Sequence, residues 1–186
     1  MHEEAQRNIE RFFNSHCAEG LKDLNILDVG SCDVNGSMKS MFWGCRSYTG
    51  IDLEEGPNVN LACGSYDTPF KDGYFDVIVS SSVFEHDPMF WLTFLEMVRV
   101  CRPGGLIFIQ VPSRGFYHPH PVDCWRFQKD SWVGLCRWGE LNGRFVEIVE
   151  SGVGEGGNGP LPEPECWNNT EAWNDCWVVY RVRSGT

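Results

Sequence analysis

The sequence predicts an α/β protein with a seven-stranded, mostly parallel sheet and helices on both faces. Three observations lead to this prediction. Short apolar segments alternate with helical patterns, which is the order of repeated β-α-β units. The first apolar segment breaks at Asp28-Val29-Gly30 into small polar residues, as at a strand-to-turn junction. The chain has 186 residues, 42% of them hydrophobic, which suits one domain with a real core.

The elements can be assigned in chain order. Helices are predicted at residues 3–17, from Pro88 to the Pro103-Gly104-Gly105 turn, and near residues 129–138. Strands are predicted near residues 25–30, 47–53, 58–62, 75–80, 105–111, 144–151 and 176–183. We therefore expect a single domain over residues 1–186, with an N-terminal helix in 1–20, a substrate-side loop at 112–127 and an irregular Gly/Pro-rich loop at 152–175.

The first two strands carry the features of a nucleotide site. A tight turn and a helix start are expected after Gly30, so that backbone N–H groups face an anionic group. Asp52 ends the next strand, 52 − 28 = 24 residues after Asp28, which suits an acid that binds ribose hydroxyls. Cys32 and Asn35 stand where a dinucleotide fingerprint has glycines. An adenosine-containing cofactor is therefore expected, and the poor match to the fingerprint makes a nicotinamide dinucleotide the less favoured alternative.

Four segments occur in a characteristic order: NILDVGSCDVNGS, YTGIDLEEGPNVNL, DTPFKDGYFDVIVSSSVFEH and CRPGGLIFIQVPS. Over residues 25–113 the chain closely resembles the class I S-adenosylmethionine-dependent methyltransferases. The resemblance implies a Rossmann-like methyltransferase fold with an antiparallel last strand, and S-adenosyl-L-methionine as cofactor. It assigns the cofactor site to Asp28, Gly30, Ser31, Asp52, Leu53, Gly64, Ser65 and Ser81.

The chain departs from the family pattern at two places. Cys32 and Val34 occupy the second and third glycine positions of the family's D-x-G-x-G-x-G loop. Gly64 falls where a family acid often binds the adenine amino group, and Asp67 is a candidate substitute. These departures keep open a rival hypothesis, a non-catalytic module that binds the cofactor or a partner.

Polar residues after the fourth and fifth strands are the candidates for catalysis, because open α/β sheets bind ligands at the carboxyl ends of their strands. His86 is either an acid/base contact or half of a structural Glu85-His86 pair. His118, Asp123 and Arg126 either face the methyl acceptor or fix their own loop through an Asp123–Arg126 ion pair. In the first case His118 or His120 could deprotonate the acceptor. Two aromatic residues of the same loop, Trp125 and Phe127, are expected to anchor it in the core.

A metal is not expected. His118, His120, Asp123 and Cys124 are competent ligands, but their spacing matches no familiar zinc pattern.

Composition and net charge restrict the classes of binding partner that are expected. The net charge of −11 argues against binding long nucleic acid, whose affinity comes largely from cationic contacts to phosphates. No apolar run is long enough for a membrane span, and Met1-His2-Glu3-Glu4 does not resemble a signal peptide, so a cytoplasmic protein is expected. The predicted reaction is methyl transfer to an oxygen or nitrogen of a small metabolite, such as a sugar or a carboxylate-bearing compound. The sequence does not define the oligomeric state.

Overall fold

The sheet runs through the whole of the computed structural model, which describes residues 3–34, 36–154 and 174–185. Within these residues the sheet has seven strands in the order β3-β2-β1-β4-β5-β7-β6. Their bounds are β1 (Asn25–Val29), β2 (Ser47–Asp52), β3 (Leu61–Ala62), β4 (Phe75–Ser81), β5 (Cys101–Arg114), β6 (Phe145–Val153) and β7 (Asn174–Arg183). The order reverses direction between β1 and β4, where an α/β sheet forms its ligand-binding crevice.

The strand directions confirm the predicted mixed sheet. The strands β3, β2, β1, β4 and β5 pair in parallel, whereas β7 is antiparallel to both β5 and β6. The parallel strands are short apolar runs, because helices or loops cover both of their faces. β5 is longer than expected, and its register with β4 shifts between Phe75 and Val77.

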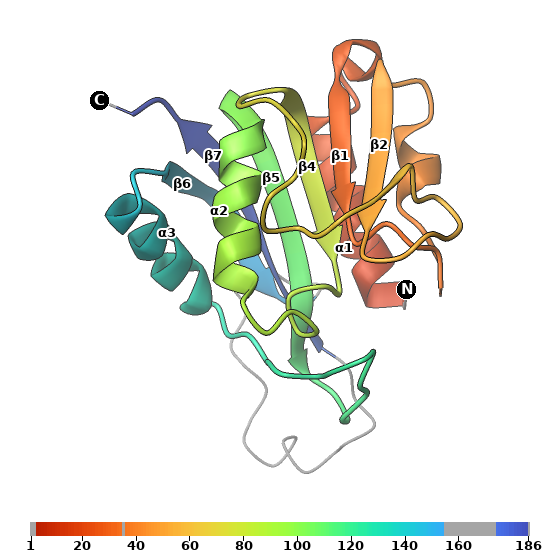
Figure 1. The fold of residues 1–186 in the computed structure, drawn as a ribbon, viewed down its shortest axis with the longest axis vertical. Coiled ribbons are helices and arrows are strands. Elements are labelled where there is room, and N and C mark those ends of the chain that lie inside the picture. The colour runs from red at the N-terminus through yellow and green to blue at the C-terminus, as the bar shows by residue number, and fades with distance from the viewer. Residues whose placement is uncertain (1–2, 35, 155–173, 186) are drawn as a thin grey trace.

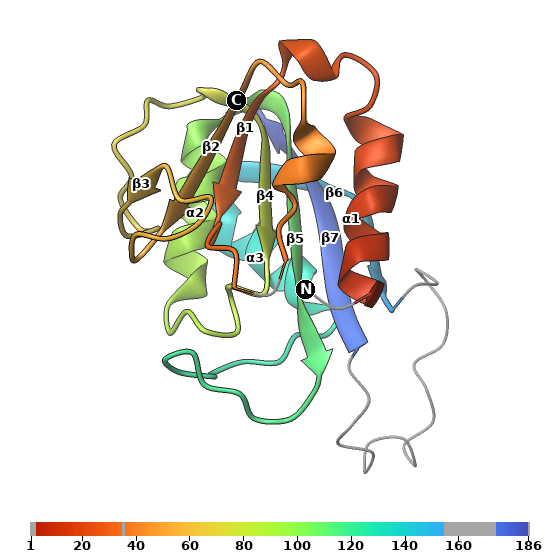
Figure 2. The same ribbon diagram turned by 90° about the vertical axis from the view of Figure 1, so that its right-hand side faces the viewer.

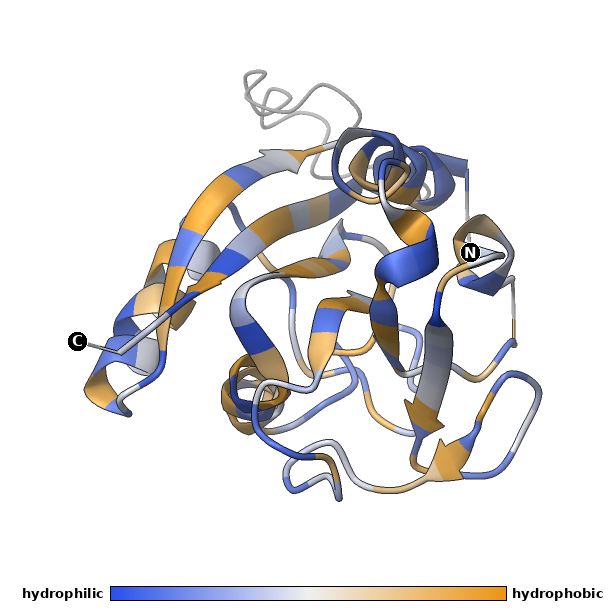
Figure 3. Ribbon diagram, turned by 90° about the horizontal axis from the view of Figure 1, so that it is seen from above, coloured by the Kyte–Doolittle hydropathy of each residue, from blue (hydrophilic) through white to orange (hydrophobic). Residues whose placement is uncertain are grey.

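Helices cover both faces of the sheet (Figures 1 and 2). α1 (Glu3–His16) lies on one face, where Ile9 and Phe12 join a core cluster with Phe108 of β5. α2 (Phe90–Val100) and α3 (Ser131–Leu141) lie on the other face and bury Phe94 and Trp132. Figure 3 shows the strands as a curved layer that carries many hydrophobic residues between these helices. The single α/β domain and its Rossmann-like arrangement are as predicted.

The segment after β1 differs from the prediction. The described residues between β1 and β2 form no α-helix. They contain one short 3-10 helix, η2 (Lys39–Phe42), which follows Gly30. Asp33 accepts a hydrogen bond from the Gly36 N–H at 2.9 Å, and Gly36 has a left-handed φ of 107°. Asp and Gly favour turns over helix interiors, because the carboxylate competes for backbone N–H groups and glycine loses more entropy. The expected helix N-terminus at the cofactor loop is therefore wrong.

Three smaller points complete the fold. The predicted strand 58–62 is reduced to Leu61–Ala62. Most of the Gly/Pro-rich loop expected at 152–175 lies outside the described residues, which omit 155–173. None of the helices that the structure describes is long and apolar enough to cross a membrane.

Candidate functional site

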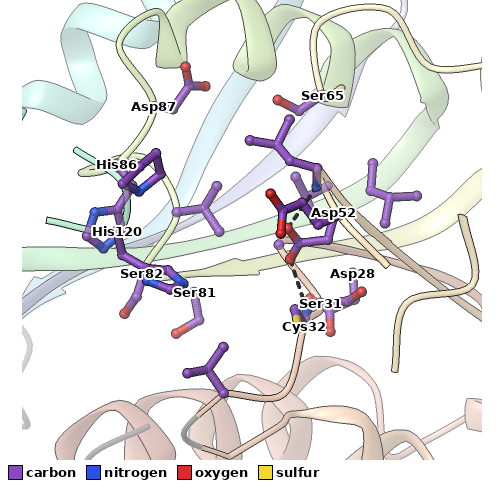
Figure 4. A pocket seen from close by; sticks show the side chains of 18 of the residues that line it. Asp28, Ser31, Cys32, Asp52, Ser65, Ser81, Ser82, His86, Asp87 and His120 are labelled. Atoms are coloured by element: carbon purple, nitrogen blue, oxygen red, sulfur yellow. Dashed lines mark hydrogen bonds between the residues drawn. The ribbon is translucent and has the colours of Figure 1, made fainter. Parts of the chain in front are cut away.

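A cavity of about 1290 Å³ opens at the carboxyl ends of β1, β2 and β4 (Figure 4). The loop between β5 and α3 (residues 115–130, the β5–α3 loop) contributes His118, His120 and the prolines between and beside them to its wall. The cavity is lined by every residue that the family resemblance assigns to the cofactor, namely Asp28, Gly30, Ser31, Asp52, Leu53, Gly64, Ser65 and Ser81. Of the four candidate catalytic residues, His86 and His118 line the cavity, and Asp123 and Arg126 lie outside its lining.

Asp28 is a buried carboxyl group at the end of β1. Its Oδ2 accepts a hydrogen bond from the Tyr48 hydroxyl at 2.5 Å, across the β1–β2 pair. Its Oδ1 has no hydrogen-bond partner among the described residues. Burial raises the pKa of Asp28 from 3.8 to about 7, and the Tyr48 hydrogen bond opposes this shift. Asp28 therefore offers an unused acceptor atom to a cationic ligand.

Gly30 makes the turn that follows β1. Its φ is +80°, and an added Cβ would lie 2.1 Å from Cγ2 of Val83. Its N–H donates to the carbonyl of Ile51 at 2.9 Å, which ties the turn to β2. Only glycine fits here, because a side chain would need both a disfavoured φ and the space of Val83.

Asp52, at the end of β2, holds the loop that follows β1. Its Oδ2 accepts from the Cys32 N–H at 3.0 Å, and its Oδ1 accepts from the Leu53 N–H at 2.8 Å. Cys32 and Val34, which replace family glycines, both line the cavity, and Val34 is exposed. A loop without the family glycines is thus held in place by the Asp52 carboxylate.

Small polar side chains also line the cavity. Ser65 Oγ lies 2.7 Å from Thr93 Oγ1, and Ser81 Oγ accepts from Gln110 Nε2 at 2.8 Å. A Cβ on Gly64 would meet no atom within 4 Å, so packing does not require glycine there. Asp67, the candidate substitute for an adenine-binding acid, is exposed and lies outside the lining of the cavity.

Histidines gather at the opposite side of the cavity, across from Asp28 and Asp52 in Figure 4. The ring of His86 meets that of His118 edge to face, with centroids 4.9 Å apart, and the centroid of His120 lies 6.3 Å from that of His86. His86 Nδ1 lies 2.6 Å from the Val122 carbonyl. Burial keeps the pKa of His86 below its usual range, so the ring is neutral at neutral pH.

Glu85 lies behind these rings and has no exposed surface. Its Oε1 is 3.7 Å from His86 Nε2, and neither carboxylate oxygen has a hydrogen-bond partner among the described residues. Burial raises the pKa of Glu85 to about 8. The backbone carbonyl of Glu85 accepts from the N–H groups of Cys124 and Trp125, at 2.7 and 3.3 Å, so the β5–α3 loop is fastened to the end of β4.

Asp123 and Arg126 form the ion pair that the sequence offered as the structural alternative. Arg126 donates from Nη1 to Asp123 Oδ1 at 2.5 Å and from Nη2 to Asp123 Oδ2 at 2.8 Å. Its remaining Nη–H groups reach the carbonyls of Trp125 and Phe116. The guanidinium holds the pKa of Asp123 well below its usual range. Asp123 also accepts from the His118 N–H at 2.8 Å, so the pair sets the position of His118.

The two loop aromatics behave differently. Phe127 is buried as predicted, with 2% of its surface exposed, and stacks on Trp132. Trp125 is 39% exposed, so its expected place in the core is wrong. Its Nε1–H donates to the Asp87 carbonyl at 3.0 Å, which places the ring at the domain surface against Phe90.

Sequence reasoning missed two residues of this region, Tyr48 and Asp87, and did not assign a third, His120, to the cavity. Tyr48 reaches Asp28 only because the strands pair in this register, which no local pattern indicates. Asp87 lines the cavity and accepts from the Met89 N–H and from the Tyr66 and Thr93 hydroxyls. The Asp87-Pro88 pair before a helix was an available signal for such a capping role. His120 was considered only as a possible metal ligand or base, yet it lines the cavity.

Part of the chain is similar to known methyltransferases. Residues 27–109 match the model of a family described as a methyltransferase domain. An uncharacterized methyltransferase of Mycolicibacterium gilvum (strain PYR-GCK) is 35% identical over 98 residues, which are 46% of this chain and 38% of that protein. The match therefore spans well under half the length of this curated relative.

Solved structures share the fold. The 1,6-didemethyltoxoflavin-N1-methyltransferase of Burkholderia thailandensis, solved with 1,6-didemethyltoxoflavin and S-adenosylhomocysteine, superposes with a TM-score of 0.66 at 18% identity, covering 98% of this chain and 80% of that chain. The [4+2]-cyclase SpnF gives a TM-score of 0.66 at 11% identity, covering 96% and 82%. At these identities the superpositions show a methyltransferase-type α/β fold. Together with the match of residues 27–109 to a methyltransferase-domain family, they show that the chain is similar to S-adenosylmethionine-dependent methyltransferases in fold and over that segment.

Proposed function

We propose that this chain binds S-adenosylmethionine in the cavity and transfers its methyl group to an oxygen or nitrogen of a small acceptor. The observation that carries the proposal is the shape of the site. One cavity joins the Asp28–Asp52 side to the His86–His118 side. A methyl donor and an acceptor could therefore lie in line within it, which is what displacement at a sulfonium carbon needs.

The residues on the Asp28 side fit the cofactor. The unpartnered Oδ1 of Asp28 suits the ammonium group of the methionine moiety. Asp52 would accept from the ribose hydroxyls, and the open space at Gly64 with the neighbouring Ser65 would take the adenine. When bound, the cofactor supplies an electrophilic methyl group, and these residues bind and orient it.

The residues on the other side would serve the acceptor. His86 and His118 are the candidate catalytic residues, because both line the cavity. Asp123 and Arg126 are better described as positioning residues, since they hold the backbone and ring of His118. Both terminal nitrogens of Arg126 already donate to Asp123 and to backbone carbonyls. This favours a neutral polar acceptor, such as a sugar hydroxyl, over a carboxylate-bearing one.

A shared fold does not fix the reaction, since a cyclase has it as well. Calorimetry with S-adenosylmethionine and S-adenosylhomocysteine tests the binding step on the full chain. Release of S-adenosylhomocysteine, measured against a panel of small hydroxyl and amine acceptors, tests the transfer. Saturable binding with acceptor-dependent release supports the proposal. Absence of binding contradicts it, and binding without transfer to any acceptor supports the rival cofactor-binding module.

The role of the histidines can be tested separately. His118→Ala should lower acceptor-dependent turnover at least tenfold and leave the affinity for S-adenosylhomocysteine within about twofold of the unchanged chain. His16→Ala is a matched control, because His16 contacts Glu150 beside α1, on the other face of the sheet. Equal turnover in the two variants would remove His118 from the acceptor site.

A further inference from the structure

We propose that Glu85, His86 and His118 bind a divalent transition-metal ion on the acceptor side of the cavity. One potential ligand atom from each of these side chains lies within 4.8 Å of the other two. The inference rests on this cluster and does not depend on methyl transfer. The proposal differs from the sequence-based expectation of no metal. That expectation considered only ligands within the β5–α3 loop, and the sequence does not indicate that Glu85 and His86 lie against this loop.

The carboxylate of Glu85 is the first argument. It is fully buried, and neither of its oxygens has a hydrogen-bond partner among the described residues. Buried polar groups are normally hydrogen-bonded or bound to a metal, so two buried carboxyl oxygens without a partner point to a ligand. The basic nitrogen His86 Nε2 lies 3.7 Å from Glu85 Oε1. A cation between these atoms would satisfy the carboxylate.

The orientation of the two imidazole rings is the second argument. Nδ1 of His86 lies 2.6 Å from the Val122 carbonyl, which can only accept, so Nδ1 donates there and Nε2 is the nitrogen that can bind an ion. Nδ1 of His118 lies 3.0 Å from the Phe116 carbonyl and 3.2 Å from Asp123 Oδ2. Metal-binding histidines are commonly held this way, with the outer nitrogen donating to a carbonyl or carboxylate.

The ligand set defines the class of ion. Two imidazoles and one carboxylate suit zinc, iron, cobalt or manganese, whereas magnesium and calcium prefer oxygen ligands alone. Bonds of about 2.0–2.2 Å would require the ligand atoms to move closer together by roughly 1 Å on binding. Three protein ligands leave a coordination position for water or for an oxygen of a bound molecule, as in catalytic metal centres. His86 and His118 line the cavity, so that position can be reached from it.

Cobalt(II) is the probe of choice, because the chain contains 9 cysteines and thiolates also bind such ions. The full chain is treated with a chelator, dialysed, kept reduced and titrated with cobalt(II) without cofactor or acceptor. We expect saturable one-to-one binding, with visible d–d bands of nitrogen and oxygen ligation and no sulfur-to-cobalt charge-transfer band. Glu85→Gln and His118→Ala should each raise the dissociation constant at least about a hundredfold.

Two controls make the result decisive. His16→Ala removes the last residue of α1, and Cys124→Ser removes the exposed thiol nearest in sequence to the cluster, so neither should change the dissociation constant. Circular dichroism melting establishes that each variant is folded. If Glu85→Gln does not fold, the test compares cobalt(II) binding by His118→Ala with binding by His16→Ala. The His118 side chain is less buried than that of Glu85, so its removal should disturb the fold less.

Several outcomes would overturn the proposal. The first is that the unchanged chain does not bind cobalt(II) saturably. The second is that the bound cobalt(II) shows a thiolate charge-transfer band. The third is that the folded His118→Ala or Glu85→Gln variant binds cobalt(II) as tightly as the unchanged chain. None of them bears on cofactor binding, which is measured without the metal, so failure here is distinguishable from failure of the proposed methyl transfer.

Discussion

Lowering the pH from about 8 to about 6 should weaken the binding of S-adenosylhomocysteine about tenfold, and Asp28→Asn should remove most of this pH dependence. The carboxyl group of Asp28 lines the cavity with one oxygen unpartnered among the described residues. An ammonium group is attracted to the ionised carboxylate but not to the neutral acid. Binding should therefore follow the ionised fraction of Asp28.

The magnitude follows from the pKa of Asp28, which burial raises to about 7. Roughly a tenth of these groups are ionised at pH 6 and roughly nine tenths at pH 8. The apparent dissociation constant is the intrinsic one divided by the ionised fraction, so the two pH values differ by about tenfold. Asn is nearly the same size as Asp and can accept the Tyr48 hydrogen bond, but it carries no charge at either pH.

The same group affects stability without ligand. Its pKa is higher in the folded chain, about 7, than the ordinary 3.8, so the native state binds more protons between these values. The stabilisation from Asp28 is thus fully present below about pH 4 and is lost as the pH rises through about 7. At about pH 8, Asp28→Asn should be more stable than the unchanged chain by up to about 4 kcal/mol, and near pH 4 the difference should vanish.

Titration calorimetry in matched buffers at several pH values measures the first effect, and urea unfolding at the same pH values measures the second. The pH dependence of binding that remains in Asp28→Asn comes from all other ionisable groups, including those of the ligand. Tighter binding at low pH, or an equal slope in Asp28→Asn, would refute an ionised Asp28 as the contact for the ammonium group.

Four further variants test other parts of the site and its surroundings. Gly30→Ala should abolish measurable cofactor binding and also lower the melting temperature, because its Cβ would meet Val83; normal binding would mean that the turn has another conformation. Asp52→Ala should weaken S-adenosylhomocysteine binding by roughly ten- to a hundredfold, and unchanged affinity in the folded variant would exclude the ribose contact. Phe127→Ala should cost about 3–5 kcal/mol of unfolding free energy, and Trp125→Ala clearly less, since only Phe127 is buried; equal losses in urea unfolding would contradict this order.

The cofactor side was predictable because its residues follow directly from strand ends. A buried apolar run such as Ile26–Val29 identifies a strand, and the parallel arrangement brings strand ends to one edge of the sheet. Asp28, Gly30 and Asp52 were assigned from this rule and from the family resemblance, and they meet in one cavity. Their roles toward the cofactor stay predictions.

The missing helix after β1 could not be predicted from the family, because this chain replaces the loop's own residues. Cys32 and Val34 stand at glycine positions, and the Asp33–Gly36 turn closes the segment before a helix can start. Trp125 was misplaced for a different reason. Its burial depends on how the β5–α3 loop folds, and the indole N–H finds its acceptor on Asp87, at the surface.

The acceptor side depends on contacts between segments far apart in sequence. The N–H groups of Cys124 and Trp125 bind the carbonyl of Glu85, so the β5–α3 loop closes over that side chain and removes it from water. Sequence reasoning identified the Glu85-His86 pair and the loop separately, and neither pattern contains their contact. Because this contact joins the loop to the segment between β4 and α2, and not to β1 or β2, changes in the loop should act on acceptor or metal binding with the cofactor side intact. The departures from the family loop, in contrast, should act on the cofactor alone.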